Sequence, residues 1–308
     1  MSLRYWLLSW LAVGALLDGC AAQGLTSRRA GPMDAPRGPW RAQTHFIPMT
    51  DAAGHSLLLQ ARVCRPLAGD SARIAVIAHG SPGQLAMREK MLLLECTDET
   101  AQWFLSRGYL VVFALRRGYG VTGGTWAEDL GQCPGADFDR AGREAARDIS
   151  AVVEYATALP FAQKDGAVVV GHSGGGLGTI AYGSAPHPAV GALVSMAGGR
   201  GGHWQFKPNS VCHSERLIES VRRFGRGATI PMLWVYSEND SFFDLSLARV
   251  MQQAYLEGGG QAGLQAIAPF DKDGHFVFTG KGGSQLWGPP VERYLAERQA
   301  AAQLNLSQ

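Results

Sequence analysis

The sequence has no excess of one charge and no block of like charges. Lys and Arg number 28 against 26 Asp and Glu, and both signs are scattered along the 308 residues. Nucleic-acid-binding proteins usually carry a basic stripe or patch, so this distribution argues against a nucleic acid partner. The 40 Gly residues follow no period and no internal repeat is visible, which argues against collagen-like and solenoid folds.

Metal-binding patterns are also missing. The chain has 5 Cys residues, with no C-x-x-C pair and no Cys/His cluster of metal-site spacing. We therefore expect no metal site, and nothing in the sequence implies another cofactor.

The amino terminus lacks a hydrophobic run long enough to span a membrane. Leu7 to Leu17 gives eleven apolar-biased residues, too few for a bilayer core of about 30 Å. With Arg4 before it and small residues after it, this stretch predicts a signal peptide over residues 1–22 and export to the periplasm or the medium. Two processing routes stay open. Cleavage after Ala22 would release the protein, whereas "LDGC" resembles a bacterial lipobox in which Cys20 is lipidated, giving an envelope lipoprotein attached to the membrane only through that lipid.

The remaining chain is long enough for one large core. Its composition is 46% hydrophobic, and single α/β domains of about 250 residues are common. We predict a flexible arm over residues 23–43, one folded domain over 44–302 and a short tail over 303–308.

Within this domain, strand-like and helix-like patterns alternate. Strand-like apolar runs occupy residues 56–63, 73–79, 109–115, 167–172, 191–197, 231–237 and 264–269. Helix-like patterns occupy residues 88–106, 138–159, 175–184, 214–224, 244–257 and 289–302. Near-continuous apolar strands are typical of parallel sheets that are buried on both faces. We therefore predict an α/β fold with a doubly wound, mostly parallel sheet flanked by helices.

The stretch "VVVGHSGGG" places a serine between a strand and a helix. Ser173 is the centre of a G-x-S-x-G pattern that begins at Gly171 and ends at Gly175. In a nucleophile elbow the serine has a strained backbone, and glycines on either side avoid collisions with neighbouring chain segments. We therefore expect Ser173 to be a nucleophile; the alternative is a tight turn that carries an ordinary serine.

A serine needs a base and an orienting acid, and in this type of fold they follow it in the order Asp or Glu, then His. Asp240 follows the strand-like run 231–237, and His275 follows the next one. Both positions are at expected strand ends, so we predict Asp240 as the acid and His275 as the base. Glu238 is a rival acid, and Asp244 is expected to cap the following helix.

The oxyanion of acyl transfer needs two backbone donors. The amide of Gly174 follows the nucleophile, and the amide of Ser81 lies in "AHGSPG", after the first long parallel strand. We predict these two as the oxyanion hole. His79 and His172 lie in the same two turns, where we expect them to pack and orient other groups.

These motifs resemble the α/β-hydrolase superfamily. The relevant stretches are "AHGSPG", "LRRGYGVTGG", "GHSGGG", "MAGGRGG", "LWVYSENDSFF" and "DGHFVF". Within the superfamily, the chain resembles exported bacterial hydrolases of the dienelactone hydrolase-like and prolyl oligopeptidase-like groups. The resemblance covers about residues 44–299 and implies a serine hydrolase with the same triad and oxyanion donors. Dienelactone hydrolases often use a Cys nucleophile, whereas this chain has Ser173.

Two segments at the catalytic edge, 123–139 and 198–216, are expected to be small loop insertions over the site. They contain Cys133 and Cys212, which we expect to form a disulfide. For Cys64 and Cys96, free thiols and a second disulfide both stay open.

Trp126 and Phe242 are candidates for an apolar substrate pocket. Arg117, or its neighbour Arg116, is a candidate ligand for a substrate carboxylate.

Three functions fit these features. The first is a carboxylesterase that cleaves a small or medium ester, its small-molecule partner, through an acyl-enzyme. The second is an amidase or peptidase with the same triad. The third is a non-catalytic envelope binding protein, against which the intact Ser, Asp, His order argues.

Overall fold

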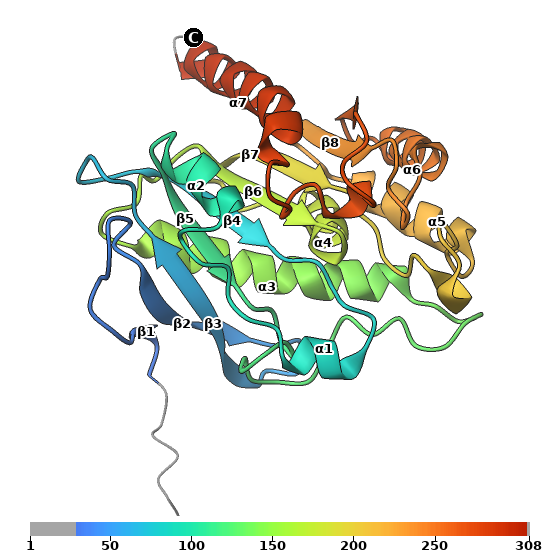
Figure 1. Cartoon of the computed structure of the whole chain (residues 1–308), viewed down its shortest axis with the longest axis horizontal. Coiled ribbons are helices and arrows are strands. Elements are labelled where there is room, and N and C mark those ends of the chain that lie inside the picture. Colours follow the sequence, from blue (N-terminus) through green and yellow to red (C-terminus); the bar gives the residue numbers. More distant parts are fainter. Residues whose placement is uncertain (1–28, 307–308) are drawn as a thin grey trace, which may run out of the picture.

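A computed structural model of the chain describes residues 29–306. These residues form a nine-stranded sheet with helices against both faces (Figure 1). The strand order is β1-β2-β3-β5-β4-β6-β7-β8-β9. Strands β4 to β9 pair in parallel, whereas β1, β2 and β3 pair antiparallel. The predicted doubly wound, mostly parallel α/β fold is confirmed.

The elements follow one another in the alternating order that the sequence predicts. The strands are β1 Gly31–Pro32, β2 Gln43–Thr50, β3 Ser56–Cys64, β4 Arg73–Ala78, β5 Tyr109–Ala114, β6 Ala167–His172, β7 Val190–Met196, β8 Met232–Ser237 and β9 Ala262–Ile267. The helices are α1 Leu85–Glu89, α2 Glu99–Leu105, α3 Phe138–Ala158, α4 Gly174–Tyr182, α5 Ser214–Gly225, α6 Leu245–Glu257 and α7 Ser284–Leu306, with short 3-10 turns η1 Trp204–Phe206 and η2 Gly274–Phe276.

The central strands are apolar throughout because each of their faces contributes to a different core. In β4, Val76 belongs to the core under α3, α4, α5 and α6, whereas Ile77 belongs to the core under α2 and α7. In β6, Val169 and Val170 divide in the same way. The alternation of side chains along a strand therefore explains the runs that predicted a doubly covered sheet.

The two ends of the domain extend beyond the predicted limits. Gly31 and Pro32 pair with Phe46 and His45 of β2, so this part of the predicted arm is bound to the sheet edge. At the other end, α7 continues to Leu306 and includes the first residues of the predicted tail. The predicted signal peptide and the lipidation site Cys20 lie outside the described residues.

The strands before β3 and the helix pattern over 88–106 differ from the sequence prediction. Strands β1 and β2 were not predicted; β2 pairs with β3 over its whole length and includes an exposed proline, Pro48, opposite Leu58. The single helix predicted for 88–106 is two short helices, because Asp98 ends the intervening loop and is the N-cap residue of α2.

Two disulfides join the four cysteines of the described chain. Cys133 pairs with Cys212, as expected. Cys64 pairs with Cys96, so neither of these two cysteines is a free thiol. Disulfides of this kind are typical of proteins in oxidising compartments. Residues 29–306 contain no helix that is both long and apolar enough to cross a membrane.

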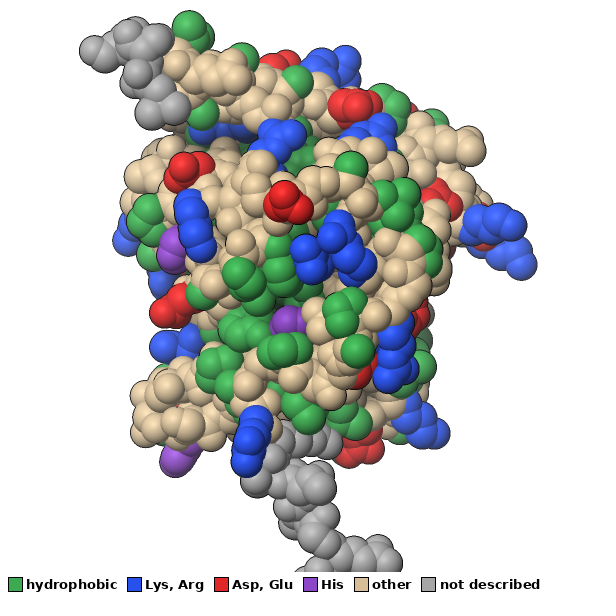
Figure 2. All heavy atoms as spheres, turned by 90° about the vertical axis from the view of Figure 1, so that its left-hand side faces the viewer, with side chains coloured by type: hydrophobic (Ala, Val, Ile, Leu, Met, Phe, Trp, Pro, Cys, Tyr) green, Lys and Arg blue, Asp and Glu red, His purple; other side chains and the backbone are tan. Residues whose placement is uncertain are grey.

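Charges of both signs are interspersed on the surface. Figure 2 shows one face, on which basic and acidic side chains alternate around a central group of hydrophobic side chains. This arrangement agrees with the even charge distribution along the sequence.

Candidate active site

The elbow at Ser173 has the strained geometry that its sequence predicts. Ser173 joins β6 to α4 with φ 52° and ψ −117°. A Cβ on Gly171 would overlap the carbonyl of Gly175, and a Cβ on Gly175 would overlap the carbonyl of Ala78 on β4. Glycine is therefore required at both positions, because the turn brings the backbones of β6, α4 and β4 into contact.

Three side chains from separate loops converge at this elbow. The Nε2 atom of His275 lies 3.0 Å from Oγ of Ser173. The Nδ1 atom of the same ring lies 3.1 Å from both carboxylate oxygens of Asp240. Asp240 can only accept, so the proton is on Nδ1 and Nε2 is free to accept the serine proton.

The acid of this triad is fixed by its own loop. Asp240 is 2% exposed and accepts hydrogen bonds from the amides of Phe242 (2.8 Å) and Phe243 (3.0 Å). The rival Glu238 is exposed to solvent. Asp244 accepts from the amide of Leu247 as the cap of α6, as expected. Of the three acids, Asp240 alone is placed at the histidine.

The loop that carries His275 is held by two further contacts. Asp273 accepts from the amides of His275 and Ser241, each at 3.0 Å, and so links the His275 loop to the Asp240 loop. Burial raises the pKa of Asp273, but the hydrogen bond from the Ser241 hydroxyl, together with these two amides, outweighs burial and lowers the pKa from its usual value. His172 donates from Nε2 to the carbonyl of His275 at 2.7 Å.

Burial and the nearby His275 lower the pKa of His172 to about 3, so this ring is neutral at physiological pH. Its orienting role matches the expectation for the turn. The second turn histidine, His79, accepts from the amide of Arg116 and donates to the carbonyl of Gly80. Burial lowers the pKa of His79 well below its usual value, so it orients backbone groups as a neutral ring.

The two predicted oxyanion donors are adjacent. An added Cβ on Gly174 would lie 3.5 Å from the backbone nitrogen of Ser81. The hydroxyl of Ser81 is bonded to the Tyr119 hydroxyl, which accepts from Nε1 of Trp126 and donates to Glu128. This chain of hydrogen bonds fixes the loop after β4 beside the elbow.

A buried charged cluster lies behind this loop. Glu128 is 2% exposed and accepts from the guanidinium groups of Arg116 and Arg200. Burial raises the pKa of Glu128, but the two arginines, Arg116 first, outweigh burial and lower the pKa to about 2. The sequence does not single out Glu128 and Arg200 as site residues. Arg200 lies in "MAGGRGG", but nothing local shows that it pairs with Glu128, 72 residues away.

The pocket next to Ser173 has a volume of about 210 Å³. Of the predicted substrate residues, Trp126 and Phe242 line it, together with Leu130, Phe243 and Arg200. Arg117 does not line it, and the structure corrects that prediction. Its guanidinium is buried against Asp148 and Glu144 of α3 and anchors that helix to the end of β5.

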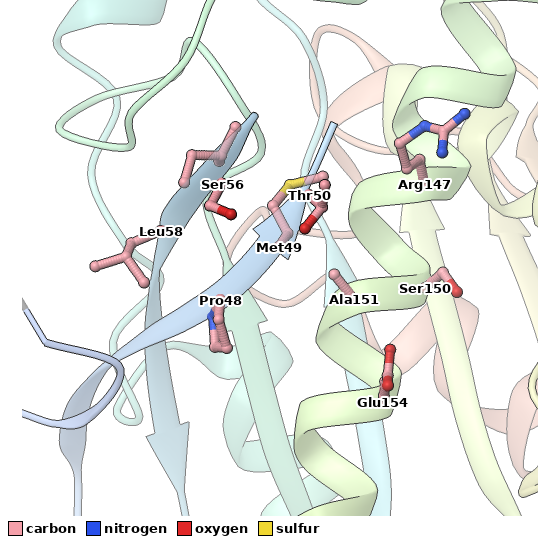
Figure 3. Close-up of a pocket in the computed structure, with 10 residues that line it drawn as sticks. Pro48, Met49, Thr50, Ser56, Leu58, Arg147, Ser150, Ala151 and Glu154 are labelled. Carbon is pink, nitrogen blue, oxygen red and sulfur yellow. The ribbon is translucent and has the colours of Figure 1, made fainter. Parts of the chain in front are cut away.

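A larger hollow lies elsewhere on the molecule. It has a volume of about 520 Å³ and lies between β2, β3 and α3, where Pro48, Leu58, Arg147 and Glu154 line it (Figure 3). It shares no residue with the pocket at Ser173, and neither a histidine nor a cysteine lines it. The catalytic geometry is therefore confined to the smaller pocket.

A cluster of potential metal ligands is formed by Cys133, Cys212 and His213. The two sulfur atoms are joined in a disulfide, and a disulfide cannot supply the thiolates that a metal requires. In residues 29–306 no other such cluster is found.

Comparison with known proteins gives the same fold. The prolyl oligopeptidase family model matches residues 96–194, which include Ser173. No curated protein matches the sequence.

Solved structures with the same fold include both esterases and peptidases. Est1E of Butyrivibrio proteoclasticus, solved with ferulic acid bound, has 16% identity and a TM-score of 0.55 over 83% of this chain and 99% of that chain. The acylaminoacyl peptidase of Pyrococcus horikoshii has 17% identity and a TM-score of 0.54 over 80% of this chain and 38% of that chain. A putative dipeptidyl aminopeptidase IV of Bacteroides ovatus has 16% identity and a TM-score of 0.58 over 83% of this chain and 36% of that chain. The chain therefore has the α/β-hydrolase fold, and its segment 96–194 is similar to the prolyl oligopeptidase family.

Proposed function

We propose that the chain is a carboxylesterase that cleaves small or medium carboxylic esters through an acyl-enzyme on Ser173. The supporting observation is the hydrogen-bonded series from Ser173 through His275 to Asp240, with distances of 3.0 and 3.1 Å. A positioned base is what converts a weakly nucleophilic hydroxyl into an attacking group.

In the first step, Nε2 of His275 takes the proton of Ser173 as Oγ attacks the ester carbonyl. The imidazolium that forms is stabilised by Asp240. The amides of Ser81 and Gly174 bind the developing oxyanion, and each such donor contributes roughly 3 to 4 kcal/mol to lowering the barrier. The carbon–oxygen bond of the ester then breaks, and His275 returns the proton to the departing alcohol.

In the second step, water repeats this sequence. His275 takes a proton from water, the resulting hydroxide attacks the acyl carbon, and the oxyanion occupies the same two amides. The bond between Ser173 and the acyl group breaks, and Oγ recovers its proton from His275. The carboxylic acid leaves, and the enzyme returns to its initial state.

The size and lining of the pocket favour an ester of modest size. Trp126, Leu130 and Phe243 provide apolar walls around about 210 Å³, a volume below the usual range for drug-sized ligands. Phe242 lies against the base itself. The dienelactone hydrolase-like subgroup stays part of this proposal, with Ser173 in place of the cysteine that those enzymes often use.

An amidase or peptidase activity of the prolyl oligopeptidase type is the second candidate, because residues 96–194 match that family model. Both activities use the same triad, so the leaving group distinguishes them. Comparing kcat/KM for p-nitrophenyl esters and p-nitroanilides with the same acyl group tests this point. A preference for the anilides would favour the peptidase.

Labelling with a fluorophosphonate tests the proposal as a whole. The reagent should label the wild-type chain and should not label Ser173→Ala. Ser184→Ala, just after α4 and outside this pocket, is the matched control and should be labelled like the wild type. Equal labelling of Ser173→Ala and the wild type, or no labelling of a folded wild type, would contradict a serine hydrolase at this site and favour a binding protein.

We also propose that the protein is exported. Its two disulfides, Cys64–Cys96 and Cys133–Cys212, are compatible with an oxidising compartment. Fractionation of expressing bacteria, with mass spectrometry of the mature amino terminus, would distinguish cleavage after Ala22 from lipidation at Cys20.

A further inference from the structure

The guanidinium group of Arg200 lies beside the nucleophile elbow. Arg200 is 8% exposed and lines the same pocket as Ser173. An added Cβ on Gly174 would lie only 2.7 Å from Nη1 of Arg200. Gly174 does not have the positive φ that would require glycine, so its missing side chain makes room for this guanidinium next to the predicted oxyanion donor.

The buried charges around this pocket do not balance. Arg116 and Arg200 share one carboxylate, that of Glu128. His79 adds no charge to this cluster, because burial keeps it neutral. Within this hydrogen-bonded cluster, two guanidinium groups against one carboxylate leave one positive charge. Asp148, which also acts on Arg116, is bonded to Arg117.

A second positive charge lies behind the loop after β4. Arg88 is 6% exposed, its guanidinium lies 3.4 Å from the centre of the Trp126 ring, and it donates to the carbonyl of Gly83 at 3.0 Å. In the described part of the chain, no ion pair joins Arg88 to a carboxylate, and its Nε atom is buried without a partner. Arg200 lies 5.2 Å from the centre of the same ring.

One acid does line the pocket. Asp129 is exposed, and its carboxylate accepts from the amide of Gly131 at 3.1 Å. Water screens an exposed carboxylate at the rim much more than it screens buried arginines. The interior of the pocket is therefore positive.

Buried charge without a counter-charge is unfavourable, and a bound anion would relieve it. A guanidinium group matches the two oxygens of a carboxylate, which it binds through paired, charge-assisted hydrogen bonds. An ester whose carbonyl oxygen lies between the amides of Ser81 and Gly174 would lie close to Arg200.

We propose that Arg200 binds a carboxylate on the acyl part of the substrate, so that the preferred substrates are monoesters of short dicarboxylic acids. This inference rests on the proposed esterase function. Arg200 thus takes the role of carboxylate ligand that the sequence suggests for Arg117. Arg200 is held by Glu128, whereas Arg117 is held by Asp148.

The test compares acidic and neutral esters of similar length. The purified chain is assayed with monoethyl succinate and monoethyl glutarate, and with ethyl butanoate and ethyl pentanoate, by measuring the ethanol released. We expect the wild type to have a higher kcat/KM for the acidic esters. Arg200→Gln should lower the ratio of acidic to neutral kcat/KM by roughly 10- to 100-fold, as expected for the loss of hydrogen bonds to a charged group.

Two further variants separate charge from geometry and from folding. Arg200→Lys keeps the charge and loses the paired donors, so its ratio should be intermediate. Arg147→Gln removes a half-exposed arginine of α3 outside this pocket and should leave the ratio unchanged. Added salt should raise KM for the acidic esters more than for the neutral ones.

Each outcome bears on the inference. An Arg200→Gln variant that slows both ester classes equally would overturn it and would indicate a general role at the oxyanion. A wild type that is labelled by fluorophosphonate and hydrolyses only neutral esters would overturn this inference alone. A folded wild type that is not labelled and hydrolyses no ester would overturn the proposed function as well. If Arg200→Gln does not fold, an Arg200→Lys ratio equal to that of the wild type overturns the inference.

Discussion

The ring of Phe242 lies against the imidazole of His275, with ring centroids 4.1 Å apart and planes inclined by 24°. On its other face, Phe242 stacks on His203, with centroids 3.9 Å apart. His203 is held in turn by hydrogen bonds of 2.9 Å to the backbone and side chain of Ser241. The imidazole of His275 is thus the last of three stacked rings. His203, in segment 198–216, supports this imidazole through the ring of Phe242.

Replacing Phe242 should loosen the base without removing it. Phe242→Leu removes the stack, and aromatic pairs contribute roughly 0.5 to 1.5 kcal/mol, so we expect kcat to fall by about 2- to 10-fold. Phe242→Tyr should retain most of the activity.

The rate of labelling by a small fluorophosphonate is the measurement, because that reagent does not need the substrate pocket. Phe276→Leu is the control, since Phe276 is about half exposed and meets His275 edge-on. A Phe242→Leu variant that labels as fast as the wild type would contradict a positioning role.

Removing any member of the triad should abolish activity and leave the fold intact. We expect Ser173→Ala, His275→Ala and Asp240→Asn each to lower kcat by about 10⁴-fold or more. Asp240→Asn is informative because the amide keeps the shape of the side chain and favours the wrong tautomer of His275.

Circular dichroism should show the same fold for all three variants. Glu238→Gln is the matched control, because that acid is exposed and was the rival in the sequence. Loss of activity in Glu238→Gln together with retention in Asp240→Asn would reverse the assignment.

The triad was predictable because its signals are local and ordered. The strand ending at His172 and the flanking glycines identify the elbow at Ser173, and the chain order then restricts the acid and the base to two strand ends. The seven predicted strands correspond to β3 through β9. Of these, β4 to β8 are buried parallel strands, which are continuous apolar runs in the sequence.

What was missed depends on contacts between distant residues. The sequence shows two adjacent arginines after β5 but does not show which one reaches the pocket; in the structure both are held by acids of other segments, Arg116 by Glu128 and Arg117 by Asp148. Arg200, which does reach the pocket, lies in "MAGGRGG", but its partner Glu128 is 72 residues away and no local pattern joins the two. Strand β2 was missed because it contains Pro48, and proline is unusual within a strand.

The stability of the protein should depend on His172 at acid pH. Burial lowers the pKa of His172 to about 3, against about 6.5 in an unfolded chain. Between these values the unfolded state binds a proton that the folded state does not, so the free energy of unfolding falls as pH decreases from about 6.5 to about 3. Above pH 6.5 neither state is protonated, and this contribution to the pH dependence is absent.

His172→Gln keeps a donor for the carbonyl of His275 and removes the titrating group. Urea unfolding at pH 7 and pH 4 should show a smaller loss of stability for this variant than for the wild type. His187→Gln is the matched control, because His187 is only partly buried in the turn between α4 and β7. Equal acid losses in the wild type and His172→Gln would contradict the prediction.

The two disulfides should contribute similarly to stability and differently to catalysis. They close 79 residues (Cys133–Cys212) and 32 residues (Cys64–Cys96), for which the chain-entropy relation gives about 4.5 and about 3.7 kcal/mol. Removing either pair by a double Cys→Ser substitution should therefore lower Tm by comparable amounts. Only Cys133 and Cys212 join the two pocket segments, one carrying Trp126 and the other carrying Arg200, so only their removal should also raise KM. Thermal unfolding measures the change in Tm, and ester kinetics at a temperature below the Tm of both variants measures the change in KM. An equal rise in KM for both double variants would show that the Cys133–Cys212 disulfide has no specific role in shaping the pocket.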